Sequence, residues 1–177
     1  MHSDIKEILI SQAELEKKAK NLASQINVHY KNKEVILLGL LKGSIIFMGD
    51  LIKYLDFPLE IDFMDVSSYY GAESIGDVKI LKDMAAEVKN KHILIVEDII
   101  DTGQTLFKIV NLLKERGAET VEIVTMLDKP EARKVKIYSK YVGFEVPKLF
   151  VVGYGLDYNE KYRNLPYIGV LKESIYN

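Results

Sequence analysis

The pattern that most constrains the fold is a strand, a helix and a second strand in succession between residues 91 and 127. The segment Lys91–Ile100 contains an apolar, partly β-branched run, which is typical of a buried strand. A helical pattern follows from Leu106 to Arg116, Gly117 is a suitable helix stop, and Val121–Leu127 is a further apolar run. A helix that joins two strands in this way lets them lie parallel in one sheet. We therefore predict an α/β fold with a central, mainly parallel sheet flanked by helices.

The remaining elements follow from hydrophobic periodicity. Ser11 followed by Glu14 is the pattern of a capping box, and apolar residues then recur at helical spacing as far as Tyr30. The stretch 67–74 is polar, aromatic and punctuated by glycine, so we predict a long loop there. No repeat or linker divides the chain, and we expect one domain, 1–177, whose first and last segments form a small second lobe. The other predicted elements are strands at Val35–Leu41, Leu59–Val66 and 150–153, and a helix after Gly43 that runs through Phe47, Leu51 and Leu55.

The composition argues against several classes of protein. Hydrophobic residues make up 48% and charged residues 28% of the chain, which is an ordinary globular balance rather than that of a disordered or membrane protein. The formal net charge of -2 supplies no general attraction to nucleic acid. The chain has no cysteine, so disulfides and thiol chemistry are excluded. The N-terminus lacks the pattern of a signal peptide, and we expect a cytoplasmic protein that binds neither membranes nor nucleic acid.

The end of the predicted strand at Lys91–Ile100 carries the chemistry. Ligands of open α/β sheets bind beyond the carboxyl ends of strands, which is where Glu97, Asp98 and Asp101 fall. The loop after them supplies hydroxyl groups, a glycine and the amides of a helix N-terminus, which suits a phosphate group. Carboxylates beside a phosphate repel it unless they act on a cation or on sugar hydroxyls. A phosphorylated sugar with Mg²⁺ meets both demands. A lone Asp-x-Gly-x-Thr would equally be explained by helix capping or solvation.

Other phosphate-binding signatures are missing from the sequence. There is no G-x-x-x-x-G-K-[ST] loop, and Gly153-Tyr154-Gly155 lacks the later glycine of a dinucleotide fingerprint. These gaps argue against an ATPase and against a dehydrogenase.

The full segment 96–106, Val-Glu-Asp-Ile-Ile-Asp-Thr-Gly-Gln-Thr-Leu, closely resembles the phosphoribosyl pyrophosphate motif of type I phosphoribosyltransferases. The resemblance implies the type I phosphoribosyltransferase fold, with a small hood lobe built from the terminal segments. It implies that Glu97 and Asp98 hold the ribose hydroxyls, directly or through Mg²⁺. It also implies that Thr102, Gly103 and Thr105 clasp the 5′-phosphate.

Four further segments resemble the hypoxanthine-guanine branch of that family. Leu41-Lys42-Gly43-Ser44 is similar to its pyrophosphate loop, and the Leu41-Lys42 bond is expected to be a non-proline cis peptide by similarity. Ser68 and Tyr69, within 66–69, resemble a mobile loop that closes over the reaction. The resemblance implies that Lys129 recognises the exocyclic oxygen of a 6-oxopurine, since a cation that donates to this oxygen rejects adenine.

The last of the four segments, 148–163, is the most specific to this branch. Within it Phe150 resembles the aromatic residue that stacks on the base, and Val151 supplies backbone groups to the edge of the base. Asp157 resembles a carboxylate that serves a second Mg²⁺ through water and lies at the purine. Arg163 resembles an arginine that binds pyrophosphate. Ile99, in the phosphoribosyl pyrophosphate motif, is also placed at the purine by the resemblance.

The resemblance implies a purine-salvage transferase that joins a 6-oxopurine base to the ribose of phosphoribosyl pyrophosphate through N9. Catalytic roles fall on Asp101, which handles the purine proton near N7, and on Lys129 and Arg163. Two alternatives stay open: a xanthine-preferring relative, and a nucleotide-sensing regulator on the same fold. The preference among hypoxanthine, guanine and xanthine is not fixed by the sequence. The resemblance implies a homodimer or homotetramer without choosing between them.

Overall fold

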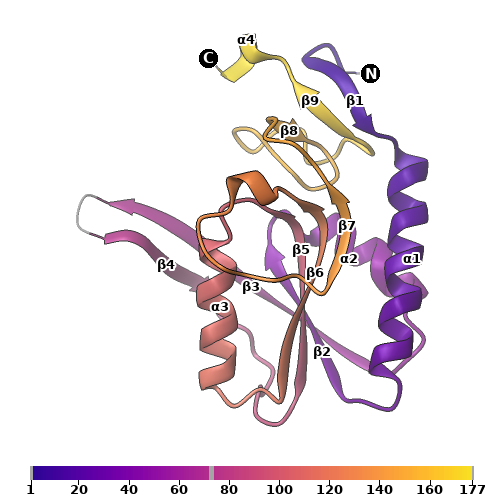
Figure 1. Ribbon diagram of the computed structural model, residues 1–177, viewed down its shortest axis with the longest axis vertical. Helices are drawn as coiled ribbons and strands as arrows, with labels where there is room; N and C mark the ends of the chain where they lie inside the picture. The colour runs from indigo at the N-terminus through magenta and orange to yellow at the C-terminus, as the bar shows by residue number, and fades with distance from the viewer. Residues whose placement is uncertain (1, 72–73, 177) are drawn as a thin grey trace.

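The protein contains two sheets, of which the larger carries most of the core (Figure 1). The computed structural model describes the backbone at residues 2–71 and 74–176, and the side chains of these ranges outside 68–78. The larger sheet has six strands in the order β4-β3-β2-β5-β6-β7. All neighbours in it are parallel except β3 and β4. Its strands are β2 (Val35–Leu41), β3 (Leu59–Gly71), β4 (Ser74–Lys82), β5 (His92–Ile100), β6 (Thr120–Asp128) and β7 (Tyr141–Glu145). The prediction of a mainly parallel central sheet is confirmed.

The smaller sheet has the strand order β1-β9-β8 and is antiparallel. It consists of β1 (Ile5–Ile10), β8 (Val151–Val152) and β9 (Ile168–Leu171), so the two ends of the chain meet in it. Figure 1 shows this sheet as a lobe at one end of the larger sheet, next to both termini. The predicted small lobe from the terminal segments is therefore present. The strand predicted at 150–153 is shorter than expected and belongs to this lobe.

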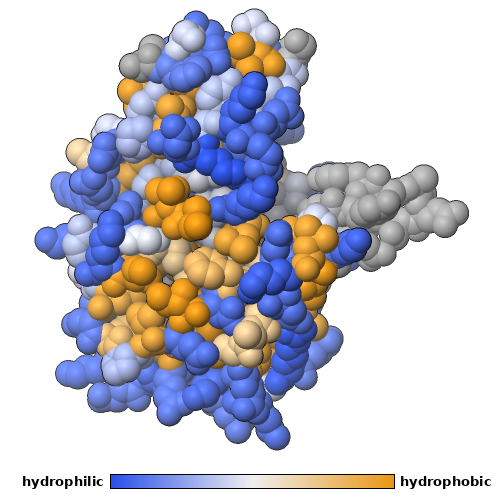
Figure 2. All heavy atoms as spheres, turned by 180° about the vertical axis from the view of Figure 1, so that it is seen from behind, coloured by the Kyte–Doolittle hydropathy of each residue, from blue (hydrophilic) through white to orange (hydrophobic). Residues whose placement is uncertain are grey.

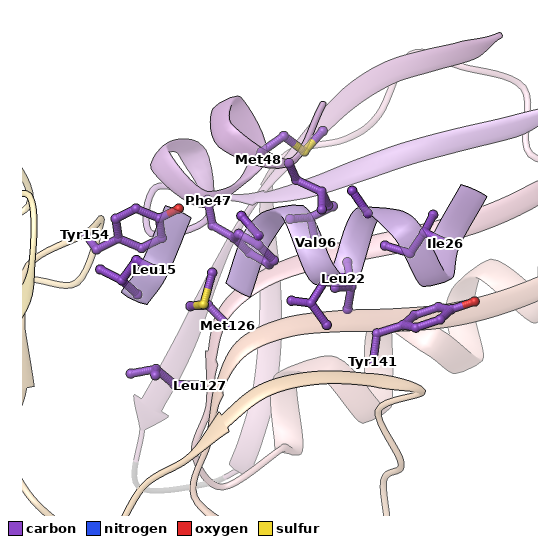
Figure 3. Close-up of a cluster of buried hydrophobic side chains, with 14 of the residues drawn as sticks. Leu15, Leu22, Ile26, Phe47, Met48, Val96, Met126, Leu127, Tyr141 and Tyr154 are labelled. Atoms are coloured by element: carbon purple, nitrogen blue, oxygen red, sulfur yellow. The ribbon is translucent and has the colours of Figure 1, made fainter. Parts of the chain in front are cut away.

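Helices cover both faces of the larger sheet because its central strands are apolar on both sides. Along β5, Leu94 and Val96 pack toward α1 (Gln12–Tyr30) and α2 (Ile45–Leu51), where Figure 3 shows Val96 among Leu22 and Phe47. Ile93 and Ile95, which alternate with them, pack against α3 (Gln104–Glu115) on the opposite face. Short helices complete the fold at η1 (Ile52–Tyr54), η2 (Pro130–Ala132) and α4 (Glu173–Tyr176).

The helix boundaries follow local chemistry. Helix α1 begins after Ser11, where the expected capping box forms: the Ser11 amide donates to Glu14 Oε2 at 2.9 Å and the Glu14 amide donates to Ser11 Oγ at 3.4 Å. Helix α3 ends before Gly117, as predicted. The helix expected to run through Leu55 is shorter, because α2 ends at Leu51 and tightens into η1.

The prediction of a long loop at 67–74 is wrong. Strand β3 continues to Gly71 and pairs antiparallel with β4, with Ser67 opposite Lys79 and Gly71 opposite Ser74. Figure 1 shows this hairpin extending away from the rest of the molecule. The polar composition predicted a loop because a strand that lies outside the core need not bury an apolar face. Such a strand lacks the alternation of polar and apolar residues by which strands are recognised.

No helix among the described residues is long and apolar enough to cross a membrane. Seen from behind, apolar side chains gather on the body below the small lobe, whereas that side of the small lobe is mostly hydrophilic (Figure 2).

Candidate active site

Three parallel strands bring the predicted functional segments to one edge of the larger sheet. Strands β2, β5 and β6 pair in register, so their carboxyl ends lie side by side. Lys42 follows β2, Asp101 follows β5 and Lys129 follows β6. The sheet thus unites groups that lie far apart in sequence, at the edge where open α/β sheets bind ligands.

The loop between β5 and α3 forms a pocket that the N-terminus of α3 helps to line. The pocket encloses about 230 Å³ and is lined by both acids and hydroxyl groups. Gly103 is the N-cap of α3 with φ of 77°, a left-handed conformation that glycine adopts without steric cost. The Gln104 amide donates to Thr102 Oγ1 at 3.4 Å, so the loop folds back on the N-terminus of α3. The backbone amides at a helix N-terminus make such a loop suitable for an anion. The lining residues are Glu97, Ile99, Ile100, Asp101, Thr102, Gly103, Thr105 and Leu106.

The two adjacent acids at the end of β5 lie in a desolvated position. Burial raises the pKa of Glu97 well above its ordinary value, and the neighbouring Asp98 adds to the shift. Burial also raises the pKa of Asp98, to about 6, although the hydrogen bond from the Ile99 amide to Asp98 Oδ1 at 2.7 Å acts in the opposite direction. Glu97 Oε2 is buried and has no hydrogen-bond partner among the described residues. Such a carboxylate is expected to have a ligand.

The loop after β2 packs directly against Asp98. A Cβ at residue 43 would lie 1.7 Å from Asp98 Oδ2, so a residue larger than glycine would displace the Asp98 carboxylate. The preceding Leu41-Lys42 peptide bond is cis, as the resemblance implied. A Cβ on Gly155, in the small lobe, would lie 2.0 Å from the Gly43 carbonyl oxygen. The pyrophosphate loop expected at Lys42 and Gly43 is therefore enclosed between Asp98 and the small lobe.

Lys129 is buried at the end of β6, with 8% of its surface exposed. Its Nζ donates a hydrogen bond to the Leu149 carbonyl oxygen at 2.8 Å. Burial lowers the pKa of Lys129, and the nearby carboxylate of Asp101 opposes this shift. An ammonium group that already donates to a carbonyl oxygen has the geometry to donate to the carbonyl of a ligand.

Phe150 directly follows Leu149, the residue whose carbonyl oxygen accepts from Lys129. Its ring belongs to an aromatic group in the small lobe. The ring stacks on Tyr176 with centroids 4.8 Å apart and meets the edge of Tyr158 at 5.6 Å. It remains 37% exposed, so it has area left for a flat ligand. Val151 follows in β8, opposite Val170 of β9.

The predicted anion-binding and acidic residues of the small lobe pair with one another. Arg163 Nη2 lies 2.9 Å from Asp157 Oδ1 and 3.3 Å from Glu160 Oε1, and Nη1 donates to the Gly155 carbonyl oxygen at 2.8 Å. Lys42 Nζ, from the other lobe, donates to Glu160 Oε2 at 3.0 Å. The charge of Asp157 raises the pKa of Asp98 and that of Arg163 lowers it, so both residues of the small lobe act on Asp98.

The carboxylates of this site can supply some of the ligands of a Mg²⁺ ion, and a substrate would have to supply the others. Carboxylate oxygens are the ligands this ion prefers, and the partnerless Glu97 oxygen lies among them. Among the described residues, no group of three or more His, Cys, Asp or Glu side chains could hold a metal ion by itself. A magnesium site here needs oxygens of the substrate, which is usual for Mg²⁺ bound to phosphates.

The side chains of the expected mobile-loop residues, Ser68 and Tyr69, lie outside the described side chains. Their backbone belongs to β3.

Sequence reasoning missed two residues of this site. Arg133 pairs with Asp128 and packs behind the phosphate loop, since a Cβ on Gly103 would lie 2.9 Å from Arg133 Cδ. Glu160 holds both Lys42 and Arg163. No local pattern in the sequence marks Glu160, because its partner Lys42 lies across the fold.

Fold and site together define an α/β protein with a loop suited to phosphate beside buried acidic residues, at the carboxyl edge of a parallel sheet. The chain matches the family described as "Phosphoribosyl transferase domain" over residues 5–159. It is 52% identical to the hypoxanthine-guanine phosphoribosyltransferase of Staphylococcus aureus (strain Mu50 / ATCC 700699), over 100% of this chain and 99% of that protein.

Comparison with solved structures gives the same family. A crystal structure of a hypoxanthine phosphoribosyltransferase from Staphylococcus aureus has a TM-score of 0.96 and 51% identity, covering 100% of this chain and 97% of that one. A hypoxanthine-guanine phosphoribosyltransferase from Bacillus anthracis, with a HEPES molecule in the active site, has a TM-score of 0.90 and 41% identity, covering 96% of this chain and 98% of that one. The protein belongs to the phosphoribosyltransferase family.

Proposed function

We propose that the protein is a hypoxanthine-guanine phosphoribosyltransferase of purine salvage. The reaction breaks the bond from ribose C1 to the pyrophosphate of phosphoribosyl pyrophosphate and forms a bond from C1 to N9 of the base. The products are IMP or GMP and pyrophosphate, and the base loses a proton. Full-length similarity to enzymes of this name supports the assignment. The observation in the molecule that carries it is the convergence of the phosphate loop, the buried acids and Lys129 on one sheet edge.

The phosphoribosyl substrate is assigned to the loops after β2 and β5. Thr102, Gly103 and Thr105 bind the 5′-phosphate through the amides of α3. Glu97 and Asp98 hold the ribose hydroxyls, which gives the buried Glu97 oxygen a partner. Lys42, Gly43 and Arg163 bind the pyrophosphate, whose charge grows as the bond to C1 breaks. The planar fork of Arg163 pairs two oxygens at once.

Mg²⁺ is proposed as the cofactor, held by Glu97 and Asp98 with substrate oxygens and, at a second position, by Asp157 through water. When bound, it neutralises charge on the pyrophosphate and orients it.

The base is assigned to the surface between Phe150 and Ile99. Phe150 stacks on the ring, Val151 offers backbone groups to the edge, and Asp157 is assigned to the same region. Lys129 would exchange its hydrogen bond to Leu149 for one to the purine O6. Adenine has an amino group at this position and cannot accept that bond, so it is rejected.

Asp101 is proposed as the group that handles the purine proton. It is exposed just after the end of β5, and its charge acts on Lys129, which supports a role beside the proposed base site. Closure of the β3–β4 hairpin, with Ser68 and Tyr69, is proposed to exclude water from the cationic sugar.

We also propose that residues 1–177 act as one domain in the cytoplasm and that the protein forms a homodimer or homotetramer. Exposed apolar residues such as Ile45 and Ile46 of α2 support an interface between copies.

Turnover with hypoxanthine, guanine, xanthine and adenine, each with phosphoribosyl pyrophosphate and Mg²⁺, tests the assignment. We expect nucleotide formation with hypoxanthine and guanine and none with adenine. Turnover confined to xanthine would identify the xanthine-preferring alternative. Binding of phosphoribosyl pyrophosphate without turnover of any base would favour a regulator.

A further inference from the structure

Glu160 occupies a backbone position that disfavours glutamate. Tyr158 and Lys161 exchange hydrogen bonds across a two-residue turn, with N to O distances of 3.2 and 3.1 Å. The two central residues, Asn159 and Glu160, have φ of 50° and 61°. Turns with positive φ at both central positions favour asparagine first and glycine second. Glutamate at the second position is strained, and such outliers gather at functional sites. A function of the Glu160 side chain would account for the glutamate at this strained position.

Each carboxylate oxygen of Glu160 accepts a hydrogen bond from a different cation. Oε2 accepts from Lys42 Nζ at 3.0 Å, and Oε1 accepts from Arg163 Nη2 at 3.3 Å. Lys42 lies on the loop after β2 and Arg163 on the small lobe, so Glu160 joins two parts of the site. The Glu160 amide donates to Asp157 Oδ2 at 2.9 Å, which fixes the turn. The two cations lower the pKa of Glu160, so it is ionised at neutral pH.

These ion pairs are placed so that they can exchange. The side chains of Lys42 and Glu160 are 60% and 63% exposed, and exposed ion pairs contribute little to stability. Arg163 keeps a spare donor, because its Nε is buried and has no hydrogen-bond partner in the described part of the chain. An anion with more charge and more oxygens than one carboxylate would satisfy both cations better.

We propose that Glu160 is a resident counter-ion of the pyrophosphate site: its carboxylate pairs Lys42 and Arg163 while the site is empty, and an incoming pyrophosphate group displaces it from both. This inference rests on the proposed function, which assigns the two cations to pyrophosphate. Glu160 is thus a positioning residue that keeps the two cations in place and lowers the affinity of the site for pyrophosphate. Lower affinity favours release of the product.

The test is calorimetric titration of the protein with pyrophosphate and with phosphoribosyl pyrophosphate, both with Mg²⁺. Glu160→Gln keeps the size and the backbone strain but removes the charge. Pyrophosphate then binds without breaking the ion pairs of Glu160 with Lys42 and Arg163. Each exposed ion pair changes an equilibrium constant by a factor of about 1.5 to 5. We expect Glu160→Gln to bind pyrophosphate about 3-fold to 10-fold more tightly, and KM for phosphoribosyl pyrophosphate to fall while kcat does not rise. Glu7→Gln, at an exposed position of β1 in the same lobe, is the matched loss of charge and should leave both affinities unchanged.

The sign of the change separates this role from others. A purely structural Glu160, or one that binds Mg²⁺, would make Glu160→Gln bind pyrophosphate more weakly, and either result overturns the inference. An equal gain in Glu7→Gln would reduce the effect to general electrostatics and overturn it as well. If the unaltered protein forms IMP but Glu160→Gln shows no tighter binding, the inference alone fails. If the unaltered protein neither binds phosphoribosyl pyrophosphate nor forms nucleotide, the proposed function fails first.

Discussion

Replacing Asp98 by asparagine is expected to stabilise the free protein while it weakens substrate binding. Burial raises the pKa of Asp98 from 3.8 to about 6. The ionised form is thus disfavoured in the folded state by about 2 pKa units, or about 3 kcal/mol at pH 7. Asparagine removes that cost and keeps an oxygen for the Ile99 amide. Allowing for relaxation, we expect a gain of about 1 to 3 kcal/mol, which raises Tm by roughly 3 to 10 °C in a chain of this size.

The gain should depend on pH in a defined direction. A carboxyl group whose pKa is raised by folding destabilises the folded state above that pKa, and the cost disappears as pH falls toward the unfolded value. With pKa values of about 6 and 3.8, the advantage of the asparagine variant shrinks to about half at pH 5 and to about a fifth at pH 4. Glu97→Gln should change stability in the same direction, because burial also raises the pKa of Glu97.

Thermal and urea unfolding of both proteins between pH 4 and pH 7.5, without Mg²⁺ or substrate, measures the difference. Asp101→Asn serves as control, because an exposed neighbour should change stability by no more than about 0.5 kcal/mol. Adding phosphoribosyl pyrophosphate and Mg²⁺ should raise Tm of the unaltered protein much more than that of Asp98→Asn. An asparagine variant that is less stable at pH 7, or a difference independent of pH, would refute the reasoning.

Four further outcomes are expected. Asp101→Asn should lower the single-turnover rate of nucleotide formation by about 100-fold to 10,000-fold while affinity for phosphoribosyl pyrophosphate survives; a near-normal rate removes Asp101 from proton transfer. Lys129→Met should lower kcat/KM for hypoxanthine by about 10-fold to 150-fold, the worth of a hydrogen bond from a charged donor, and an unchanged value argues against contact with O6. Burial and Lys140, 2.9 Å from His29 Nε2, lower the pKa of His29, so its contribution to stability is lost as pH falls below about 6.5; unfolding of His29→Asn should show less acid sensitivity there. Amide exchange at residues 67–71 should slow only when both substrates are bound, and equal exchange in the free and ternary states contradicts closure of the hairpin.

Four strands of the larger sheet, β2, β3, β5 and β6, could be predicted from the sequence because their signals are local. The apolar runs at β2, β5 and β6 are continuous, as buried parallel strands require, and helices of adequate length separate them. The capping box at Ser11 and the stop at Gly117 lie within a few residues of the boundaries they set. For the same reason the phosphate loop was recognisable, since its acids, hydroxyls and glycine are contiguous.

The smaller sheet and the hairpin depend on pairing that local patterns do not encode. Strand β1 has a mixed burial pattern and finds its partner, β9, more than 150 residues later. Strands β4 and β7 were missed, because neither shows clean alternation and each is fixed by its neighbour in the sheet. The roles of Arg133 and Glu160 arise from contacts across the fold with Asp128, Lys42 and Arg163, so no spacing in the sequence announces them.

A crystal structure of the protein with Mg²⁺, phosphoribosyl pyrophosphate and an unreactive 6-oxopurine analogue tests the proposed site most directly. We expect the 5′-phosphate on the amides of residues 102–105, the ribose hydroxyls at Glu97 and Asp98, and the purine on Phe150 with its O6 within hydrogen-bond distance of Lys129 Nζ. A purine bound away from both Phe150 and Lys129, or a phosphate group bound away from the N-terminus of α3, would contradict this expectation.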